Sequence, residues 1–162
     1  GGVVPKLCVG SVERGVEVAV NGGRFGFPVV DVKVELLDGS THEVDSSEIA
    51  FRMAAINCFR EAEEKSSPVI LEPVMKVEIS VPEQFTGDVI GNLQSRRAEV
   101  EGFEDGVGGI RLVHATVPLS EMFGYMTTLR SQTQGRGTFT MEFSSYREIP
   151  ENIKKQKFGI TF

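Results

Sequence analysis

The stretch of residues 117–143 limits the possible folds more than any other part of the chain. Pro118 ends a strand, because a proline has no N–H to donate to a neighbouring strand. A helix is predicted from about Ser120 up to Gly135 and Gly137. One face of this helix is apolar at four positions: Met122, Phe123, Met126 and Leu129. A half-buried strand follows, in which apolar residues alternate with polar ones: Phe139, Met141 and Phe143.

The second half of the chain follows a Ser-Ser-Pro boundary at residues 66–68. Three further strands are predicted: 75–81, in which apolar and polar residues alternate, and then 99–103 and 110–117. A short helix is predicted over 86–97 and a glycine-rich hairpin loop over 105–109. The order βαββαβ is that of a ferredoxin-like sandwich, here over 68–148, with an antiparallel sheet and two helices on one face. The charged tail, 149–162, is expected to be loosely held.

The first half, residues 1–67, reads as a partial α/β domain, which makes the whole chain α+β. A helix is predicted after Pro5, with valines on one face: Val9, Val12, Val16 and Val20. Alternating valines predict a strand over 29–37. Residues 45–48 resemble a capping box, with an acceptor side chain at Asp45 and a glutamate three positions later. They open a second helix, whose expected apolar face is Ile49, Met53, Ile56 and Phe59.

Composition describes a globular protein with no membrane-spanning run: 40% of its 162 residues are hydrophobic and 25% are charged. The net charge of −6 argues against an autonomous nucleic-acid binder, although local basic spots remain. Cys8 and Cys58 are too few for a disulfide framework and are expected to be buried free thiols. Because the chain has no initiator methionine and no signal-peptide pattern, we expect it to be part of a longer protein.

Several multi-residue motifs closely resemble the C-terminal part of bacterial-type translation elongation factor G. In the second half they are LEPVMKVE at 71–78, TGDVIG at 86–91, SRR at 95–97 and the block 117–143. In the first half they are GGVVPK at 1–6, GFPVVD at 26–31 and DGSTHEVDSSE at 38–48. The resemblance extends over about residues 1–150 in the family's order. It implies the end of the penultimate domain, an incomplete ribosomal-protein-like βαβ unit, followed by the last domain.

This resemblance implies a ribosomal translocase, in which GTP hydrolysis drives the movement of tRNA and mRNA in the cytoplasm or an organelle. GTP and Mg²⁺ would be bound by an N-terminal domain, because these 162 residues contain no G-x-x-x-x-G-K-[S/T] phosphate loop and no cofactor or metal motif. The partners implied are the ribosome, tRNA and mRNA, with no membrane. In isolation this part of the chain is expected to have no enzymatic activity.

The resemblance also assigns candidate contact residues. Two loops, 21–28 and 38–45, would form the tip that touches tRNA and mRNA. The tip residues are Gly22, Gly23, Arg24, Asp38, Gly39, Ser40, Thr41 and His42. His42 occupies the family's tip histidine and would act by hydrogen bonding and shape, because no partner base or nucleophile is near it in sequence. Four arginines could contact ribosomal RNA: Arg96, Arg97, Arg130 and Arg136.

Residue patterns alone leave other interpretations open. A lone loop histidine is usually inert, and the spacing of Asp45 and Glu48 is explained by helix capping. His114 is expected on a sheet face. Three aromatic residues could stack on RNA, but core packing is favoured because no aromatic nucleotide-binding strand motif is present: Phe123, Tyr125 and Phe139. The alternative function is a regulatory or RNA-binding ferredoxin-like module of an unrelated protein.

A last expectation concerns the strand predicted at 29–37. Domains of the resembling type have strands before the position of Gly1, so the 29–37 segment should lack a sheet neighbour and the valine face of the first helix should be under-covered. Unpaired edges and exposed apolar faces recruit partners. We therefore expect the first half to be loosely packed or to self-associate through the valines of the 29–37 segment or of the first helix, the segment valines being Val30, Val32 and Val34.

Overall fold

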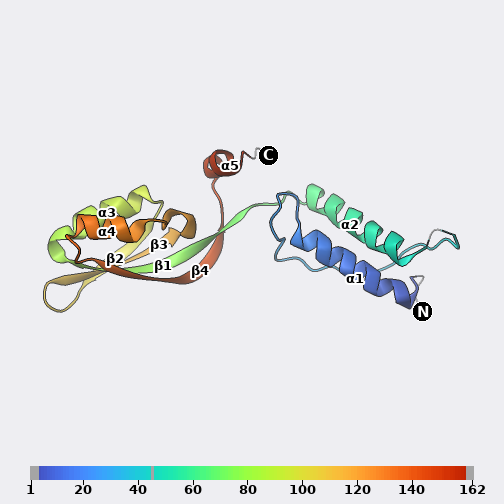
Figure 1. The fold of residues 1–162 in the computed structure, drawn as a ribbon, viewed down its shortest axis with the longest axis horizontal. Helices are drawn as coiled ribbons and strands as arrows, with labels where there is room; N and C mark the ends of the chain where they lie inside the picture. The colour runs from blue at the N-terminus through green and yellow to red at the C-terminus, as the bar shows by residue number, and fades with distance from the viewer. Residues whose placement is uncertain (1–3, 45, 160–162) are drawn as a thin grey trace. The chain divides into compact units, whose positions relative to one another are not determined.

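A computed structural model describes residues 4–44 and 46–159. The chain divides between Pro68 and Val69 into two compact units, and each is described here by itself. The first unit is a pair of helices joined by a long extended segment, and the second is a layered domain of strands and helices (Figure 1). None of the helices in the described ranges is long and apolar enough to cross a membrane.

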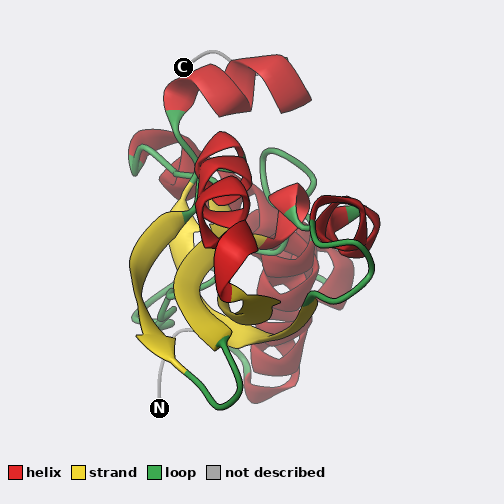
Figure 2. Cartoon of the chain, turned by 90° about the vertical axis from the view of Figure 1, so that its left-hand side faces the viewer, coloured by secondary structure: helices red, strands yellow, loops and turns green. Residues whose placement is uncertain are grey.

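The second unit contains a four-stranded antiparallel sheet in the order β2-β3-β1-β4. The strands are β1 (Leu71–Pro82), β2 (Glu99–Asp105), β3 (Ile110–Pro118) and β4 (Thr138–Glu148). Two helices lie on one side of the sheet, α3 (Thr86–Ser95) and α4 (Tyr125–Gln132) (Figure 1). Figure 2 views this unit end-on and shows the sheet to be twisted and curved. This topology confirms the predicted βαββαβ sandwich.

The core of the second unit lies between the sheet and the two helices. Strict alternation along β1 directs Val77, Ile79 and Val81 to the same side, and the β3 partners of the first two, Ala115 and Val113, are equally buried. The helices contribute Val89, Leu93, Tyr125 and Leu129. Burying a side chain of this size stabilises the fold by about 1.5–3 kcal/mol. The packing of this layer therefore holds the two helices against the sheet.

The helix predicted from Ser120 begins later than expected. Ser120 lies in a 3₁₀ turn, η2 (Leu119–Glu121), and α4 begins at Tyr125 after Gly124, whose φ of +74° is left-handed. The tighter turn shifts the periodicity, so the buried side chains are Met122, Tyr125 and Leu129. The predicted burial of Phe123 and Met126 is wrong: Phe123 is 80% exposed and Met126 is also exposed. On the edge strand β4, Phe139 packs on the core whereas Met141 and Phe143 are exposed.

The tail that was expected to be loosely held forms a helix, α5 (Glu151–Phe158). A second 3₁₀ turn, η1 (Glu83–Phe85), lies between β1 and α3. Ile149 is buried and donates its N–H to the carbonyl of Ile70 at 2.9 Å. Lys154 is buried with its Nζ 2.6 Å from Glu151, and Lys157 donates to Ser120 at 3.0 Å. The charged side chains Lys154 and Lys157 therefore bind other residues of the unit and do not only face solvent.

The first unit is built on α1 (Lys6–Asn21) and α2 (Glu48–Lys65). The side chains that α1 buries are small: Cys8, Ser11, Gly15 and Ala19. An ideal Cβ on Gly15 would lie 2.5 Å from the backbone oxygen of Arg52, so the backbones of the two helices lie in close contact there. The valine face predicted for α1 is not the contact face, because small residues allow closer packing; its valines are exposed or half-buried.

The second helix also differs from its prediction. Its N-cap is Ser47, whose Oγ accepts the N–H of Ala50 at 3.1 Å, while Glu48 is the first helical residue and lies 3.5 Å from Arg14. The predicted capping box is therefore absent from the described residues, and Asp45 lies outside them. Of the expected apolar face, Ile56 is buried and Phe59 half-buried, but Ile49 and Met53 are exposed. Cys58 is exposed, against the prediction, whereas Cys8 is buried.

The segment 29–37 does not form a strand, and Asp31 within it has a left-handed φ of +58°. A strand requires a hydrogen-bonded neighbour, and the described part of the first unit offers none. The apolar side chains of this segment are about half exposed: Val30, Val32, Val34 and Leu36. The prediction of a formed strand is therefore wrong.

Candidate nucleic-acid interface

The two loops expected to form one tip lie at opposite ends of the first unit. Helices α1 and α2 run in the same direction: Ser11 lies beside Glu48 near the helix starts, and Gly23 lies beside Glu63 near the helix ends. The 18 residues of α2 span about 27 Å. The residues 22–24 and 38–42 are therefore held apart by the length of the helix pair, and the expectation of a single shared tip is wrong.

The loop of residues 38–42 lies at the start of both helices. A Cβ on Gly39 would meet the side chain of Val4 at 2.6 Å, so this glycine permits the loop to lie against the segment before α1. The N–H of His42 donates to Ser46 Oγ at 2.6 Å, and the N–H of Ser46 donates to the carbonyl of His42 at 3.2 Å. The backbone at His42 is thereby fixed, while the residue itself is exposed.

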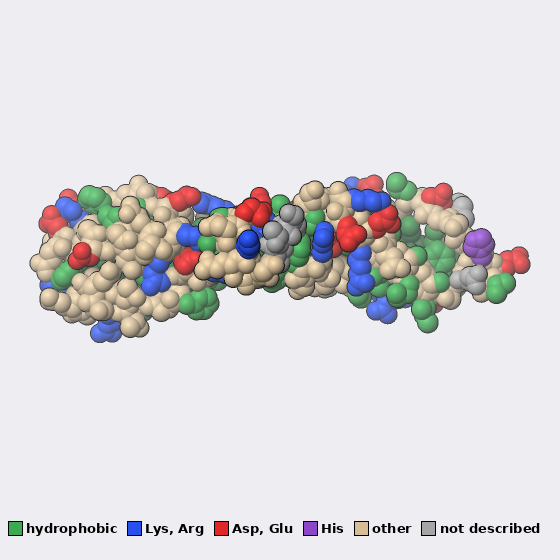
Figure 3. All heavy atoms as spheres, turned by 90° about the horizontal axis from the view of Figure 1, so that it is seen from above, with side chains coloured by type: hydrophobic (Ala, Val, Ile, Leu, Met, Phe, Trp, Pro, Cys, Tyr) green, Lys and Arg blue, Asp and Glu red, His purple; other side chains and the backbone are tan. Residues whose placement is uncertain are grey.

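The charged side chains of this loop do not by themselves favour the binding of a phosphate group. Its described charged side chains are acidic, Asp38 and Glu43, and Arg14 is paired with Glu48. On the side seen in Figure 3, acidic and basic side chains are intermixed and no continuous basic patch is visible. An RNA contact at this end would therefore depend on the imidazole, the backbone and the shape of the loop, rather than on a basic field.

The loop at the other end is tightly enclosed. Gly23 is buried, and a Cβ there would lie 2.6 Å from Val29 Cγ2 and 3.0 Å from Glu63 Oε1. Glu63 also accepts the backbone N–H of Arg24 at 2.8 Å, and the Arg24 guanidinium lies 5.6 Å from the centre of the Phe25 ring. Glu63, which no sequence pattern singles out, thus anchors this loop to α2.

Two of the four arginines proposed for RNA contact are used inside the second unit. Arg96 donates to the carbonyls of Glu121 and Phe123 and to Thr128 Oγ1, and its guanidinium lies 5.0 Å from the centre of the Tyr125 ring. It therefore fixes the turn that precedes α4.

Arg97 joins three elements through carboxylates. It binds Glu72 of β1 in a bidentate manner at 2.6 and 2.9 Å, and Glu121 of η2 at 3.0 Å. The hydrogen bond with Glu72, and then that with Glu121, raises the pKa of Arg97 against the opposing effect of burial. Burial alone would raise the pKa of Glu121, but Arg97 and Lys157 lower it below its usual value. Arg97 is thus fully engaged within the fold.

The other two arginines are exposed. Arg130 lies on the outer side of α4, and Arg136 follows that helix with its guanidinium 5.1 Å from the centre of the Phe85 ring. Phe123, at 80% exposure, is the aromatic side chain that the sequence interpretation wrongly assigned to the core. Tyr125 and Phe139 do pack in the core, edge to face at a 5.0 Å centroid distance, as predicted.

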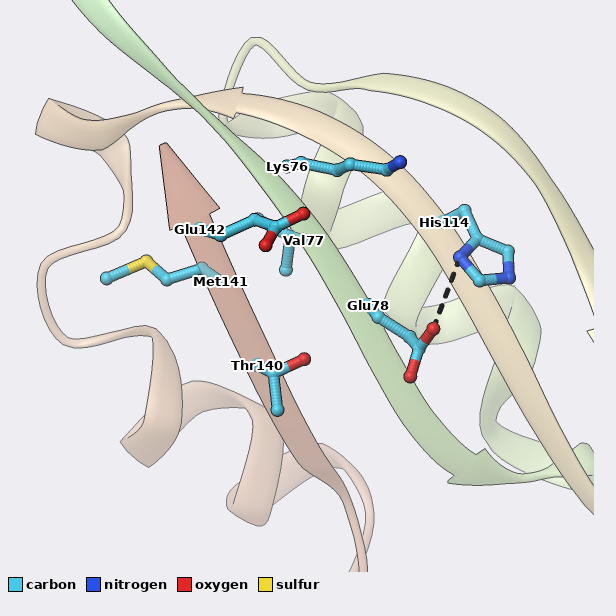
Figure 4. A pocket seen from close by; sticks show the side chains of 7 residues that line it. All are labelled: Lys76, Val77, Glu78, His114, Thr140, Met141 and Glu142. Atoms are coloured by element: carbon cyan, nitrogen blue, oxygen red, sulfur yellow. Dashed lines mark ion pairs between the residues drawn. The ribbon is translucent and has the colours of Figure 1, made fainter. Parts of the chain in front are cut away.

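The uncovered face of the sheet carries a shallow hollow (Figure 4). Lys76 and Glu78 project from β1, His114 from β3, and Thr140 and Glu142 from β4. His114 Nδ1 lies 3.7 Å from Glu78, and its Nε2 lies 3.6 Å from Glu104 of β2. The prediction of His114 on a sheet face is confirmed. Its surroundings are acidic, so this face does not suit phosphate.

The described residues hold no cluster of three histidine, cysteine or acidic side chains that could bind a metal ion. Sequence reasoning also missed Ser46, whose bonds to His42 cross a turn and leave no periodic signal. What the structure assembles is an exposed histidine on a fixed loop in the first unit, and two exposed arginines in the second.

Comparisons with known proteins assign both units. The family model described as elongation factor G, domain IV, matches residues 1–67, and the model described as elongation factor G C-terminus matches residues 69–157. Elongation factor G of Aquifex pyrophilus is 56% identical over 160 residues, which are 98% of this chain and 23% of that protein. A crystal structure of a Thermus thermophilus protein matches with a TM-score of 0.84 and 39% identity, covering 96% of this chain and 24% of that one. The chain thus spans about a quarter of the length of these relatives.

Proposed function

The chain belongs to the elongation factor G family, and we propose from this premise that it is the part of a ribosomal translocase whose loop 38–42 reaches tRNA and mRNA. The observation that carries the proposal is the exposed His42 at the end of the helix pair, with its backbone held by Ser46. The alternative of a module from an unrelated protein is excluded by the family assignment.

His42 would act as a hydrogen-bonding and steric probe. The hydrogen bonds described for His42 are made by its backbone, and the charged side chains beside it are acidic. The parallel helices α1 and α2 are in close backbone contact at Gly15, which would support the loop from behind. A rigid support is what a residue needs if it is to hold tRNA or mRNA at a fixed distance.

The second unit would contact ribosomal RNA through Arg130 and Arg136. Both side chains are exposed, whereas the donors of Arg96 and Arg97 are directed to partners within the unit. Removing one phosphate contact weakens binding uniformly and reduces its salt dependence. Replacing Arg130 or Arg136 should therefore affect ribosome binding, while replacing Arg97 should mainly lower stability.

GTP hydrolysis would take place elsewhere in the parent protein. The 162 residues contain no phosphate-loop motif, so GTP and Mg²⁺ would be bound by a segment that this chain does not include. The ribosome, tRNA and mRNA are the proposed partners. The contribution of this chain would be mechanical and not catalytic.

The test is a His42→Ala substitution in the full-length factor that contains this chain. We expect single-round translocation to slow by about 10-fold, as for one lost hydrogen bond of about 1.5 kcal/mol, with ribosome-stimulated GTP hydrolysis unchanged. Arg24→Ala is the matched control, because Arg24 is also exposed but lies at the opposite end of the helix pair. Equal losses of translocation and GTP hydrolysis with His42→Ala would refute the proposal.

A further inference from the structure

Two consecutive serines at the start of α2 have different bonding partners. Ser47 Oγ accepts the N–H of Ala50 at 3.1 Å and caps the helix. Ser46 Oγ instead accepts the N–H of His42 at 2.6 Å, and the N–H of Ser46 returns a bond to the His42 carbonyl at 3.2 Å. Both backbone polar groups of His42 are thus bonded to one residue, which lies four positions later.

We infer that Ser46 is the positioning residue for His42 at the tip of this unit, an inference that rests on the proposed function. Ser46 does not touch tRNA or mRNA in this role; it fixes the backbone from which the imidazole projects. The second bond distinguishes it from a simple cap, since the helix start is already satisfied by Ser47.

The need for such a residue follows from the exposure of the loop. The described residues from Thr41 to Val44 are all exposed, so no core packing defines their conformation. An exposed loop without internal bonds samples many backbone conformations and loses entropy when it binds. The reciprocal pair between His42 and Ser46 removes part of that freedom before tRNA or mRNA is met.

The inference predicts a specific ranking of variants in the full-length factor. Ser46→Ala should slow translocation several-fold with GTP hydrolysis unchanged, and Ser46→Thr, which keeps the accepting oxygen, should restore the rate. Ser47→Ala is the matched control, because it weakens the helix start but leaves the His42 bonds intact. In a His42→Ala background, Ser46→Ala should add no further loss. A wild-type rate for Ser46→Ala, or an additive loss in the double variant, would overturn the inference.

A second readout separates this inference from the proposed function. In the 162-residue chain, the His42 amide should exchange slowly with solvent, exchange faster in Ser46→Ala, and remain protected in Ser46→Thr and Ser47→Ala. If that pattern appears but His42→Ala leaves translocation unchanged, the proposed function fails and the positioning bond stands. If the His42 amide of the unmodified chain exchanges as fast as that of Ser46→Ala, the positioning role is refuted whatever the translocation rate.

Discussion

Tyr125 shows at the scale of one residue how the second unit uses a polar side chain in its core. The side chain is fully buried, with its ring against Phe139 and the guanidinium of Arg96 over its face. Its hydroxyl has no hydrogen-bond partner among the described residues. Burial raises the pKa of Tyr125 to about 12, with the charge of Arg96 opposing the shift. Ionisation of this residue and folding of the unit are therefore coupled.

The coupling predicts a loss of stability at high pH. The folded pKa of about 12 exceeds the unfolded value of about 10, so stability is complete below pH 10 and declines as the pH rises from 10 to 12. The chain has two tyrosines, so Tyr146→Phe leaves Tyr125 as the only one to titrate by ultraviolet absorbance. We expect a midpoint near 12, and a smaller loss of stability over this range in Tyr125→Phe. A midpoint near the ordinary tyrosine value of about 10, while circular dichroism still reports the fold, would contradict this.

At the scale of elements, the periodicity of apolar residues in the sequence predicted most of the helices and strands of the second unit. Alternation along residues 75–81 identified the central strand β1, because this strand buries one face against helices, and the strand predicted over 110–117 is the other central strand, β3. The elements that were predicted wrongly depend on contacts between residues far apart in the sequence. The turn before α4 is fixed by Arg96, which directly follows α3, and α5 is held by contacts to residues some 37 positions away, such as Ser120. No local pattern encodes either contact.

In the first unit, more of the predictions made from local sequence patterns are wrong. Valines at helical spacing indicated one face of α1, but the face in contact is the stripe that contains Gly15 and Ala19. The segment 29–37 has the alternation of a strand and no neighbour to make it one. For the site, the resemblance assigned both loops to one tip. Their separation follows from the parallel direction of α1 and α2, which only the fold reveals.

Two glycines of α1 test the packing of this element. Gly10→Ala should stabilise the first unit by about 0.5–1 kcal/mol, because alanine favours helix and its Cβ would meet only Arg14 Nη1 at 3.5 Å. Gly15→Ala should instead destabilise it by about 1–3 kcal/mol, because its Cβ would lie 2.5 Å from a backbone oxygen of α2. Urea denaturation followed by helix circular dichroism measures both. Changes of the same sign would refute the close contact.

At the scale of the whole molecule, the open segment of the first unit offers a surface for a second copy. Along residues 32–37, Lys33 and Glu35 lie on one side, where they form an ion pair with each other that pairing with a second copy would exchange, and half-exposed apolar residues lie on the other. Antiparallel pairing centred on Val34 would place Lys33 of each copy opposite Glu35 of the other. Such a register combines two ion pairs with an apolar strip, so we propose that the chain self-associates through it.

Exchanging the charges at positions 33 and 35 tests this pairing register. We expect sedimentation velocity to show concentration-dependent dimers for the unmodified chain. Lys33→Glu and Glu35→Lys should each be monomeric alone, because like charges then face each other, and a mixture of the two should form a heterodimer. A monomer at every concentration, or a Lys33→Glu chain that associates as well as the original, would rule out pairing through this segment.

The central claim is that the end of the first unit carrying His42, and not the end carrying Arg24, reaches tRNA and mRNA. Directed hydroxyl-radical cleavage from a tethered iron chelate tests it on ribosomes bound by the full-length factor. The chelate would be attached to a cysteine at Thr41 or at Arg24, with the exposed Cys58 replaced by serine. We expect cleavage of tRNA or mRNA from position 41 and none from position 24. Cleavage from position 24 alone, or equally from both, would contradict the claim.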